Sequence, residues 1–281
     1  MLGAIAGDII GSLYEGLRTK KKDFRLFTPL SIYTDDTVLT VAVADAILKG
    51  KDYGPTIKSY ARHFPFRGYG PKFTRWFLLP FTKPYNSLGN GSAMRVSPVA
   101  HAFQTEKEVL DQARLSAACT HNHPEGIKGA QAIALAVFLA RNHASKEEIR
   151  SAISHRFGYN LSRHIDDIRP LYRINLTCPG SVPEAIVAFL DSDSFEDAIR
   201  NAVSLGGDAD TQAAMAGAIA EAFYGHIPAP ILQGVSTRLN RGFKQTLLQF
   251  CQTFGTPLMI EQAQCVSHGS SHEALGPPPS R

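Results

Sequence analysis

The chain has 281 residues, of which 44% are hydrophobic and 19% are charged, a composition typical of a globular protein with a large core rather than a disordered one. Its formal net charge of +4 is too small to indicate the concentrated basic surface of a nucleic-acid-binding protein. The longest internal apolar run, 132–140, is too short to span a bilayer, which argues against a membrane protein.

The cysteines and the amino-terminal segment bear on the cellular compartment. No CxxC pair occurs among the four cysteines, so we interpret them as free thiols in a reducing compartment. The apolar segment 1–16 has no basic region and contains Asp8 and Glu15, so it does not have the pattern of a signal peptide. Together these features predict a soluble cytoplasmic protein.

Apolar residues recur at helical spacing through most of the chain. They predict helices over 3–15, 35–49, 106–121, 126–143, 145–157, 181–190, 194–205, 210–225 and 234–254. Gly3, Gly7 and Gly11 share one stripe of the first helix, and glycine destabilises a helix by roughly 1 kcal/mol relative to alanine. The stripe therefore predicts that another helix packs very close. Pro183 is predicted to lie in a first helical turn, where proline is tolerated.

Local signals mark several helix ends. Thr34 or Asp35 is the predicted N-cap of the helix over 35–49, and Gly50 is its predicted stop. Ser145 and Glu148 have the spacing of a capping box, in which each side chain bonds the other residue's backbone N–H.

No run of alternating β-branched residues occurs, so we predict an all-α fold, with residues 1–264 as one domain. Two irregular stretches, 16–33 and roughly 63–90, interrupt the helices, and loops of this length in a compact domain are usually functional. The end of the chain, 265–281, becomes rich in Ser, Pro and Gly and is predicted to be a disordered tail.

Two acidic clusters stand at predicted helix starts. They are Thr34, Asp35 and Asp36 in "YTDDTVL", and Asp208, Asp210 and Thr211 in "SLGGDADTQAA". Hard divalent cations bind oxygen ligands, and such residues can converge on a point beyond the helix end. A helix N-terminus carries partial positive charge, so a site for Mg²⁺ or Mn²⁺ requires several carboxylates together. The alternative is that each cluster only caps its helix, and the sequence leaves both open.

A glycine-rich turn and a basic segment are further candidates for anion binding. In "NSLGNGSAMRVSP", Gly89 and Gly91 permit a backbone whose amide groups cradle a phosphate, although an ordinary Asn-Gly turn has the same composition. The segment "RTKKKDFR" attracts an anionic ligand or forms a solvated loop.

The segment "CTHNHPEG" invites comparison with zinc sites. Its histidines are too densely spaced to match common zinc-ligand patterns, and no second Cys/His pair stands nearby. We expect instead that His121 or His123 lines a cleft, or that one of them caps the helix that starts near Pro124.

Taken in order, these elements resemble the ADP-ribosylglycohydrolase family, which includes the dinitrogenase-reductase-activating glycohydrolases. The resemblance spans residue 3 to about 225 and rests on "GAIAGDIIGSLYEG", "YTDDTVLT", "SLGNGSAMRVSP", "THNHPEGIKGAQAIA" and "SLGGDADTQAAMAGAIAEA". The ordered combination is far more specific than any one motif. It implies a compact orthogonal multi-helix bundle with a binuclear Mg²⁺ or Mn²⁺ centre.

The resemblance also implies roles by position. The implied metal ligands are Thr34, Asp35, Asp36, Asp208, Asp210 and Thr211. Glu15, at the end of the first predicted helix, matches the glutamate that approaches the metals and the scissile bond, so catalysis is expected to involve Glu15, Asp36 and Asp208. The substrate-binding residues that the resemblance implies are the members of the loop that holds the diphosphate and distal ribose, Ser87, Gly89, Asn90, Gly91 and Ser92. His121 matches a histidine that lines the ADP-ribose cleft.

One position departs from the family pattern. Leu88 stands where some relatives have an aromatic residue, so adenine stacking is expected from Tyr69, Trp76 or Phe81.

The implied function is metal-dependent hydrolysis of the bond between ADP-ribose and a modified acceptor, most simply a protein side chain. Two alternatives remain open on the sequence. One is a hydrolase of a small metabolite such as O-acetyl-ADP-ribose, or of ADP-ribosylated nucleic acid. The other is a non-catalytic ADP-ribose-binding protein. The expected partner is an ADP-ribose-bearing substrate rather than a membrane. The acceptor is not assigned, because the residues that choose it lie in variable loops.

Overall fold

The computed structural model describes residues 1–17, 19–80 and 83–268, and these residues confirm the all-α prediction. The helices are α1 Leu2–Gly11, α2 Asp35–Leu48, α3 Tyr53–His63, α4 Pro71–Leu78, α5 Gly91–Met94, α6 Ser97–Ala102, α7 Glu106–Ala118, α8 Pro124–Arg141, α9 Lys146–Phe157, α10 Ile165–Ile168, α11 Cys178–Leu190, α12 Phe195–Val203, α13 Ala209–Tyr224, α14 Ala229–Ser236, α15 Arg241–Phe254 and α16 Pro257–His268. Extended backbone pairs, within these ranges, only at a bridge between Gly89 and Thr177.

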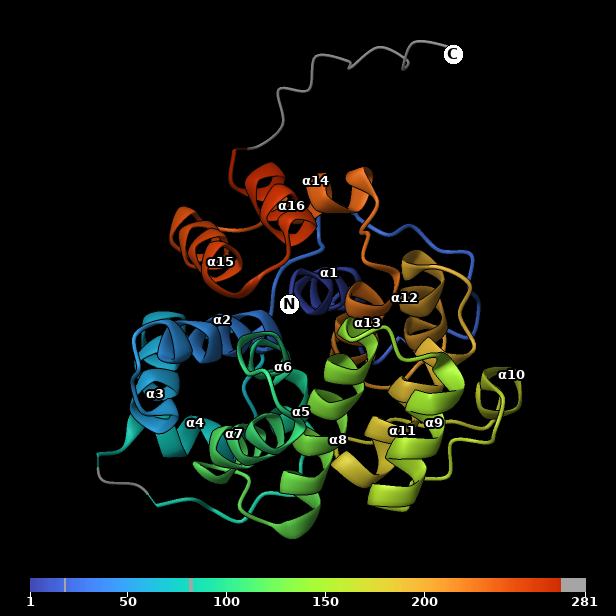
Figure 1. Cartoon of the computed structure of the whole chain (residues 1–281), viewed down its shortest axis with the longest axis horizontal. Helices are drawn as coiled ribbons and strands as arrows, with labels where there is room; N and C mark the ends of the chain where they lie inside the picture. The colour runs from blue at the N-terminus through green and yellow to red at the C-terminus, as the bar shows by residue number, and fades with distance from the viewer. Residues whose placement is uncertain (18, 81–82, 269–281) are drawn as a thin grey trace.

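Helices α1 and α13 form the centre of the molecule (Figure 1). Every residue of α1 is buried, and α13 packs against α1 as well as α8, α11 and α12. Helices α2, α3, α4, α6 and α7 lie to one side of this pair, and α14, α15 and α16 cover its upper end (Figure 1). The remaining core is built largely from alanine, valine and isoleucine, whose small volumes suit closely spaced helices.

The glycine stripe of α1 is where α13 comes closest, as the sequence predicts. A Cβ atom on Gly7 would lie 2.1 Å from the carbonyl oxygen of Ala213, and one on Gly3 would lie 2.2 Å from that of Gly217. A Cβ on Gly11 would lie 2.5 Å from the Cα of Asp210. These distances are far below van der Waals contact, so only glycine allows the two backbones to touch. The contact brings the start of α13 against the end of α1.

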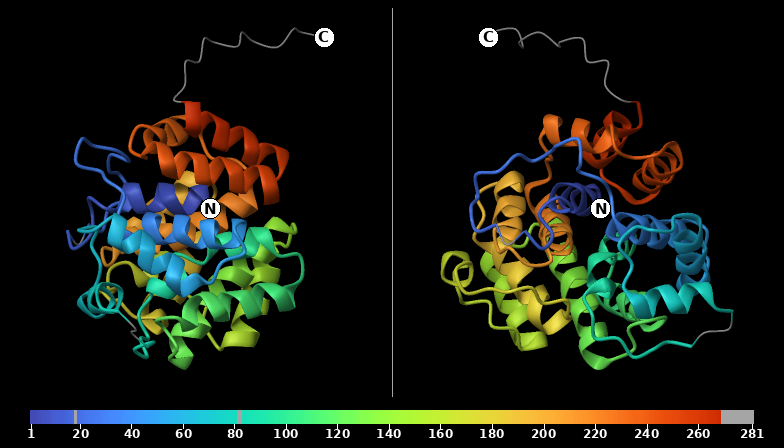
Figure 2. Two further views of the ribbon diagram at one scale, coloured as in Figure 1. Left: turned by 90° about the vertical axis from the view of Figure 1, so that its left-hand side faces the viewer. Right: turned by 180° about the vertical axis from the view of Figure 1, so that it is seen from behind.

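The long connection between α1 and α2 is irregular, as predicted, and it crosses the outside of the molecule (Figure 2). Two arginines fasten it to the helices beneath. Arg200 of α12 donates to the carbonyl oxygens of Lys22 and Phe24 at 2.7 and 2.9 Å, and Arg238 donates to that of Thr28 at 2.8 Å. The described part of the basic segment 18–25 therefore packs against neighbouring helices.

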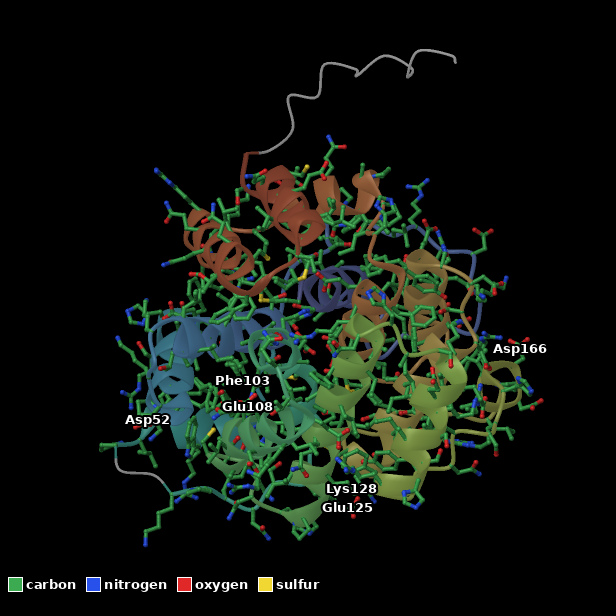
Figure 3. The ribbon with its side chains drawn as sticks, in the orientation of Figure 1. Asp52, Phe103, Glu108, Glu125, Lys128 and Asp166 are labelled. Atoms are coloured by element: carbon green, nitrogen blue, oxygen red, sulfur yellow. The ribbon has the colours of Figure 1, made fainter. Side chains whose placement is uncertain are left out.

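Helix ends follow the capping signals. Thr34 is the N-cap of α2, and Ser145 forms the predicted capping box of α9 with Glu148. Thr105 forms a second such box with Glu108 at the start of α7. Figure 3 shows Glu108, Asp52 and Asp166 with the other charged side chains that surround the bundle.

Three predicted helix boundaries are wrong. Helix α1 ends at Gly11, so Glu15 lies beyond it in a turn. Helix α11 begins at Cys178, which places Pro183 inside the helix and leaves Pro179 in the first turn. The predicted helix 234–254 is divided into α14 and α15, because the Asn240 side chain accepts from the Phe243 N–H at 2.9 Å and starts a new helix there.

The stretch 63–90 is not wholly irregular, because it contains α4. This helix has only eight residues, and its apolar face is aromatic, with Phe73, Trp76 and Phe77 buried. Near the carboxyl terminus, α16 continues to His268, past the predicted domain boundary at 264. The rest of the predicted tail, 269–281, lies outside the described residues.

We expect Gly7→Ala to lower the free energy of unfolding by about 2 kcal/mol or more, because the added methyl group meets backbone atoms of α13. Gly54→Ala in α3 is the matched control. Its Cβ would lie 3.4 Å from the Cys119 Cβ, an ordinary contact, and alanine favours a helix, so its stability should stay equal or rise by roughly 0.5 kcal/mol. Urea unfolding of both variants measures the difference. Equal stabilities would contradict the α1–α13 contact.

Candidate functional site

The amino-terminal ends of α2 and α13 meet beside α1, and the two acidic clusters meet with them. At α2 the capping interpretation holds, since the Thr34 hydroxyl accepts from the Asp36 N–H at 3.3 Å. At α13 it fails, because Asp208 occupies the N-cap position without a side-chain capping bond. The Asp208 carboxylate instead accepts from Nδ2 of Asn90 at 2.6 Å. Asp208 therefore serves the space beyond the helix, whereas Asp210 accepts from the Thr211 N–H at 2.9 Å within the first turn.

Asp8 of α1 is an acidic member of this site that the sequence analysis did not single out. It is fully buried and accepts from the Thr34 N–H at 3.0 Å, the Thr34 hydroxyl at 2.7 Å and the Thr37 N–H at 3.0 Å. An aspartate within an otherwise apolar helix, directly after a glycine of the close-packed stripe, was the signal available. The hydrogen bonds of Asp8 with Thr34 and Thr37 connect the start of α2 to α1.

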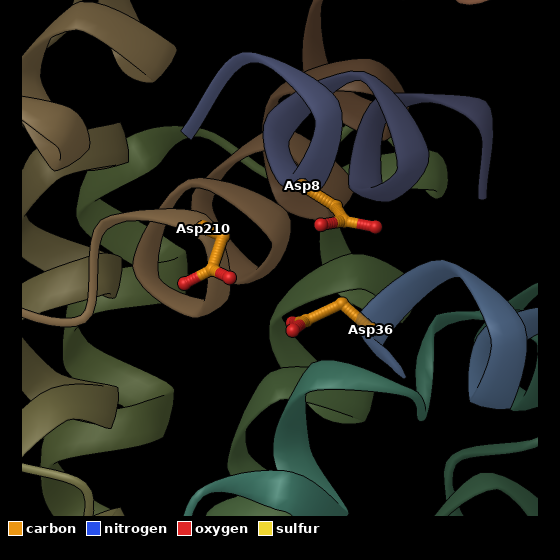
Figure 4. Close-up of side chains that lie close together, drawn as sticks. All are labelled: Asp8, Asp36 and Asp210. Carbon is orange, nitrogen blue, oxygen red and sulfur yellow. The ribbon is translucent and has the colours of Figure 1, made fainter. Parts of the chain in front are cut away.

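Three carboxylates from three helices converge at this point (Figure 4). Oxygen atoms of Asp8, Asp36 and Asp210 lie within 4.8 Å of one another. Glu15, Asp208 and Asp210 form a second such group with the same spacing. Asp210 belongs to both, so the two predicted clusters form one continuous acidic centre. Among the described residues, no lysine or arginine forms an ion pair with any of these carboxylates.

Burial and mutual repulsion raise the pKa of these carboxyl groups. Loss of hydration is the largest cause for Asp36 and Asp210, whose pKa values are raised well above the ordinary range, and neighbouring carboxylates add to it. Burial, with the charge of Asp8 next, raises the pKa of Asp35 to about 8. Burial and then the charge of Asp208 raise the pKa of Glu15. Without a bound cation these carboxyl groups therefore retain protons at a pH at which ordinary carboxyl groups are ionised.

The residues fit a divalent cation. Oδ1 of Asp36 is buried and has no hydrogen-bond partner among the described residues, although a buried carboxylate oxygen ordinarily has one. The Thr211 hydroxyl lies 3.2 Å from Oδ2 of the same carboxylate. Carboxylate and hydroxyl oxygens are the donors that Mg²⁺ and Mn²⁺ prefer. A cation here would satisfy the orphaned oxygen and offset the repulsion.

A cleft of about 500 Å³ opens above the acidic centre. The predicted residues that line it are Glu15, Asp35, Ser87, Gly89, Asn90, Gly91, His121, Asp208 and Thr211. Thr34, Asp36 and Asp210 do not line the cleft. The backbone N–H of Asp35 donates to the carbonyl oxygen of Arg67 at 2.7 Å, which fixes the irregular segment before α4 along the cleft.

The glycine-rich turn forms one wall of the cleft and leads into α5. Its position is fixed by the Asn90 N–H, which donates to the carbonyl oxygen of Leu176 at 2.9 Å. The Asn90 side chain then joins the turn to Asp208. Ser92 was expected to bind the substrate, but it does not line the cleft. Its hydroxyl is buried and donates to the carbonyl oxygen of Gly126 at 2.7 Å. It secures the turn to α8.

Each of the two histidines of "CTHNHPEG" has one of the two expected roles, lining the cleft or capping a helix. His121 lines the cleft, whereas His123 is the N-cap of α8 and accepts from the Glu125 N–H at 3.1 Å.

The expected adenine-stacking residues are not at the cleft. Trp76 is buried in the core and Tyr69 stacks on Phe73 rather than lining the cleft, while Phe81 lies outside the described residues. Phe73 and Tyr85 are the aromatic residues that line it. The sequence does not reveal them, because exposure at a cleft depends on which face of α4 and of the following loop turns inward.

Comparison with known proteins agrees with this geometry. The family model of the ADP-ribosylglycohydrolases matches residues 1–262. The chain belongs to this family. The resemblance inferred from the motifs is thereby confirmed, and the protein is a glycohydrolase.

Relatives of this glycohydrolase cover most of its length. ADP-ribosylhydrolase ARH3 of Gallus gallus is 29% identical over 314 residues, which cover 82% of this chain and 85% of the relative. ARH3 of Homo sapiens is also 29% identical, over 318 residues with the same coverage. ADP-ribosylarginine hydrolase Tri1 of Pseudomonas putida is 28% identical over 263 residues, covering 80% of this chain and 69% of the relative.

A solved structure has the same fold. It is titled "ADP-ribosylglycohydrolase-related protein complex", superposes with a TM-score of 0.68 at 25% identity, and covers 93% of this chain and 95% of that one. None of the helices among the described residues is both long and apolar enough to cross a bilayer.

The stability of the metal-free glycohydrolase should fall as the pH rises. Carboxyl groups with a raised folded-state pKa bind more protons in the folded chain than in the unfolded chain, so deprotonation favours unfolding. For Asp35 this interval runs from 3.8 to about 8. We expect the Tm of the wild type in EDTA to fall by several degrees across this pH interval. Asp35→Asn should reduce the fall in Tm, and saturating Mg²⁺ in place of EDTA should reduce it further.

Asp111→Asn is the control for this titration. Asp111 is half exposed and pairs with Lys107 on α7, and an exposed pair contributes little to stability, so the slope should stay that of the wild type. A Tm in EDTA that rises or stays level over the interval would contradict the crowding of carboxylates.

Proposed function

We propose that this glycohydrolase cleaves the glycosidic bond between C1 of the distal ribose of ADP-ribose and a modified protein side chain, with two Mg²⁺ or Mn²⁺ ions as cofactors. One observation carries the proposal. Asp210 belongs to both carboxylate groups, and the second group, through Glu15 and Asp208, reaches the floor of a cleft walled by the Gly89–Gly91 turn.

The proposed ligands to the cations are Thr34, Asp35, Asp36, Asp208, Asp210 and Thr211. Asp8 is proposed as a support rather than a ligand, because four N–H or O–H groups of Thr34 and Thr37 already occupy its oxygens. When bound, the cations would orient the vicinal ribose hydroxyls and lower the pKa of a water molecule.

Glu15 is the proposed general base. It lies on the cleft floor, and burial together with the charge of Asp208 raises its pKa, which makes its carboxylate a stronger proton acceptor. The oxygen of water forms a bond to C1 while the bond from C1 to the acceptor breaks. Glu15 takes the proton from the water and returns it, directly or through solvent, to the acceptor that leaves. The positive charge that develops on the ribose during this step is stabilised by the nearby carboxylates.

The opposite parts of the cleft suit the rest of the substrate. Backbone N–H groups near Gly89 and Gly91 are the proposed donors to the diphosphate. Phe73 and Tyr85 replace Tyr69 and Trp76 as the proposed partners of the adenine ring, since both line the cleft.

Removal of one central carboxylate should abolish activity without unfolding the chain. We expect Asp36→Ala and Asp208→Ala each to lower ADP-ribose release from an ADP-ribosylated protein by about a hundredfold or more, with an unchanged helical circular dichroism spectrum. Each substitution removes a buried carboxyl group together with its hydrogen bonds, and the unchanged spectrum is the readout that separates loss of activity from loss of structure. Excess EDTA should have the same effect on the wild type.

Asp45→Ala is the matched control on the same helix as Asp36. Asp45 pairs with Lys49 at 2.7 Å, away from the cleft, so its loss should leave release within about twofold of wild type. Full activity of either central variant, or of the wild type in EDTA, would exclude the metal-dependent mechanism.

A panel of acceptors tests the substrate. Purified protein is assayed with arginine-linked and serine-linked ADP-ribose on protein, with thymidine-linked ADP-ribose and with O-acetyl-ADP-ribose, each in Mg²⁺ and in Mn²⁺. We expect the fastest release from a protein side chain. Release only from the nucleoside or the acetyl ester would reassign the substrate. Tight calorimetric binding of ADP-ribose without any turnover would favour a binding protein.

A further inference from the structure

Arg95 is a buried cation without an opposite charge. It follows α5, is completely buried and lines the cleft. Its Nη2 donates to the Thr120 hydroxyl at 2.9 Å and to the carbonyl oxygen of Ser116 at 3.2 Å. Nε and Nη1 have no hydrogen-bond partner within the described part of the chain, and no carboxylate there forms an ion pair with it. Burial of an unpaired guanidinium is costly, so its position needs a reason other than stability.

The Thr120 hydroxyl joins Arg95 to His121. Its oxygen lies 2.7 Å from Nδ1 of the imidazole. A guanidinium only donates, so the hydroxyl oxygen must accept from Arg95 and has one proton of its own to place. Nδ1 of His121 is the one acceptor that the described residues offer this proton. If Nδ1 accepts this proton, the proton of the neutral ring resides on Nε2.

Nε2 faces the glycine-rich turn. A Cβ atom on Gly91 would lie 3.2 Å from Nε2, and one on Gly89 would lie 3.5 Å from it. Both glycines also line the cleft, so the absence of side chains there leaves the Nε2 edge accessible to a ligand. Burial of the ring, and then the charge of Arg95, hold the pKa of His121 well below its ordinary value, which keeps the ring neutral.

We propose that Arg95 and Thr120 are positioning residues that hold His121 as the Nε2–H tautomer, so that Nε2–H is a preformed donor to a phosphate oxygen beside the glycine-rich turn. The identity of the ligand rests on the proposed function, whereas the tautomer does not. A donor that is oriented before binding strengthens the complex, because no tautomer or ring orientation has to be selected when the ligand arrives.

Imidazole ¹⁵N chemical shifts of the full-length protein test the tautomer directly. The signal of His121 is assigned as the one that disappears in His121→Gln. We expect a protonated-type shift at Nε2 and an unprotonated-type, hydrogen-bonded shift at Nδ1. Thr120→Val, which is nearly isosteric but has no hydroxyl, should move both shifts towards a mixture of tautomers, whereas Thr120→Ser should restore the wild-type shifts. A protonated Nδ1 in the wild type, or identical spectra of the wild type and Thr120→Val, would overturn the proposal.

A second buried threonine provides the matched control. The hydroxyl of Thr56 in α3 donates to the carbonyl oxygen of Asp52, the N-cap of that helix, so Thr56→Val removes a comparable hydrogen bond elsewhere. Thr56→Val should leave the His121 shifts unchanged. This result would distinguish a specific effect of the Thr120 hydroxyl on His121 from a general loss of stability. Arg95→Met should also mix the tautomers, and the threonine variants carry the test if that variant does not fold.

Calorimetry with ADP-ribose then tests the purpose of the tautomer. Thr120→Val should weaken binding by roughly three- to tenfold, with Thr120→Ser and Thr56→Val close to wild type. If the predicted tautomer is observed and the wild type does not bind ADP-ribose, the proposed function is wrong, but the positioning of His121 by Arg95 and Thr120 is supported. If the wild type binds and hydrolyses its substrate with Nδ1 of His121 protonated, the positioning of His121 by Arg95 and Thr120 is wrong, but the proposed function is supported.

Discussion

The close approach of α1 and α13 is the constraint on which the site depends. Because glycines of α1 let the two backbones touch, Asp8 and Asp210 are brought together in a place from which water is removed. Loss of hydration alone raises the pKa of such groups, and the neighbouring carboxylates raise it further. Crowding and burial therefore destabilise the ionised form of these carboxyl groups at the centre of the protein. The densely packed apolar core holds the groups in place, and a divalent cation would offset their repulsion.

The cleft combines this acidic floor with a different kind of wall. Glu15 and Asp208 lie at the floor, whereas the glycine-rich turn, His121 and the buried Arg95 form a wall that has N–H donors and one positive charge. Such an arrangement suits a ligand with hydroxyl groups at one end and phosphates at the other. The Asn90 side chain joins the wall to the floor through its 2.6 Å hydrogen bond to Asp208.

Several features of the fold and of the site leave no clear pattern in the sequence. Helix α4 was hidden because an eight-residue helix with an aromatic apolar face and flanking glycines and prolines gives no clear helical period. The α1 boundary was set too late because the apolar pattern continues through the turn to Glu15. Asp8 was overlooked because a single aspartate in an apolar helix, even directly after a glycine of the stripe, does not distinguish a ligand or support from another buried polar residue. Trp76 and Phe73 lie three residues apart, and only packing decides which of them reaches the cleft.

The sequence by itself determined the helical class, the family, the glycine stripe and the two acidic clusters, because these are recorded in local spacing and in the order of motifs. Tertiary structure alone decided that the clusters are one centre, since the meeting of Asp36 with Asp210 depends on how α2 and α13 pack around α1. It likewise decided that Asp208 faces Asn90 instead of capping α13, and that Ser92 faces α8 instead of the cleft. The direction of a side chain at a helix end depends on which partners are within reach, and those partners come from distant parts of the chain.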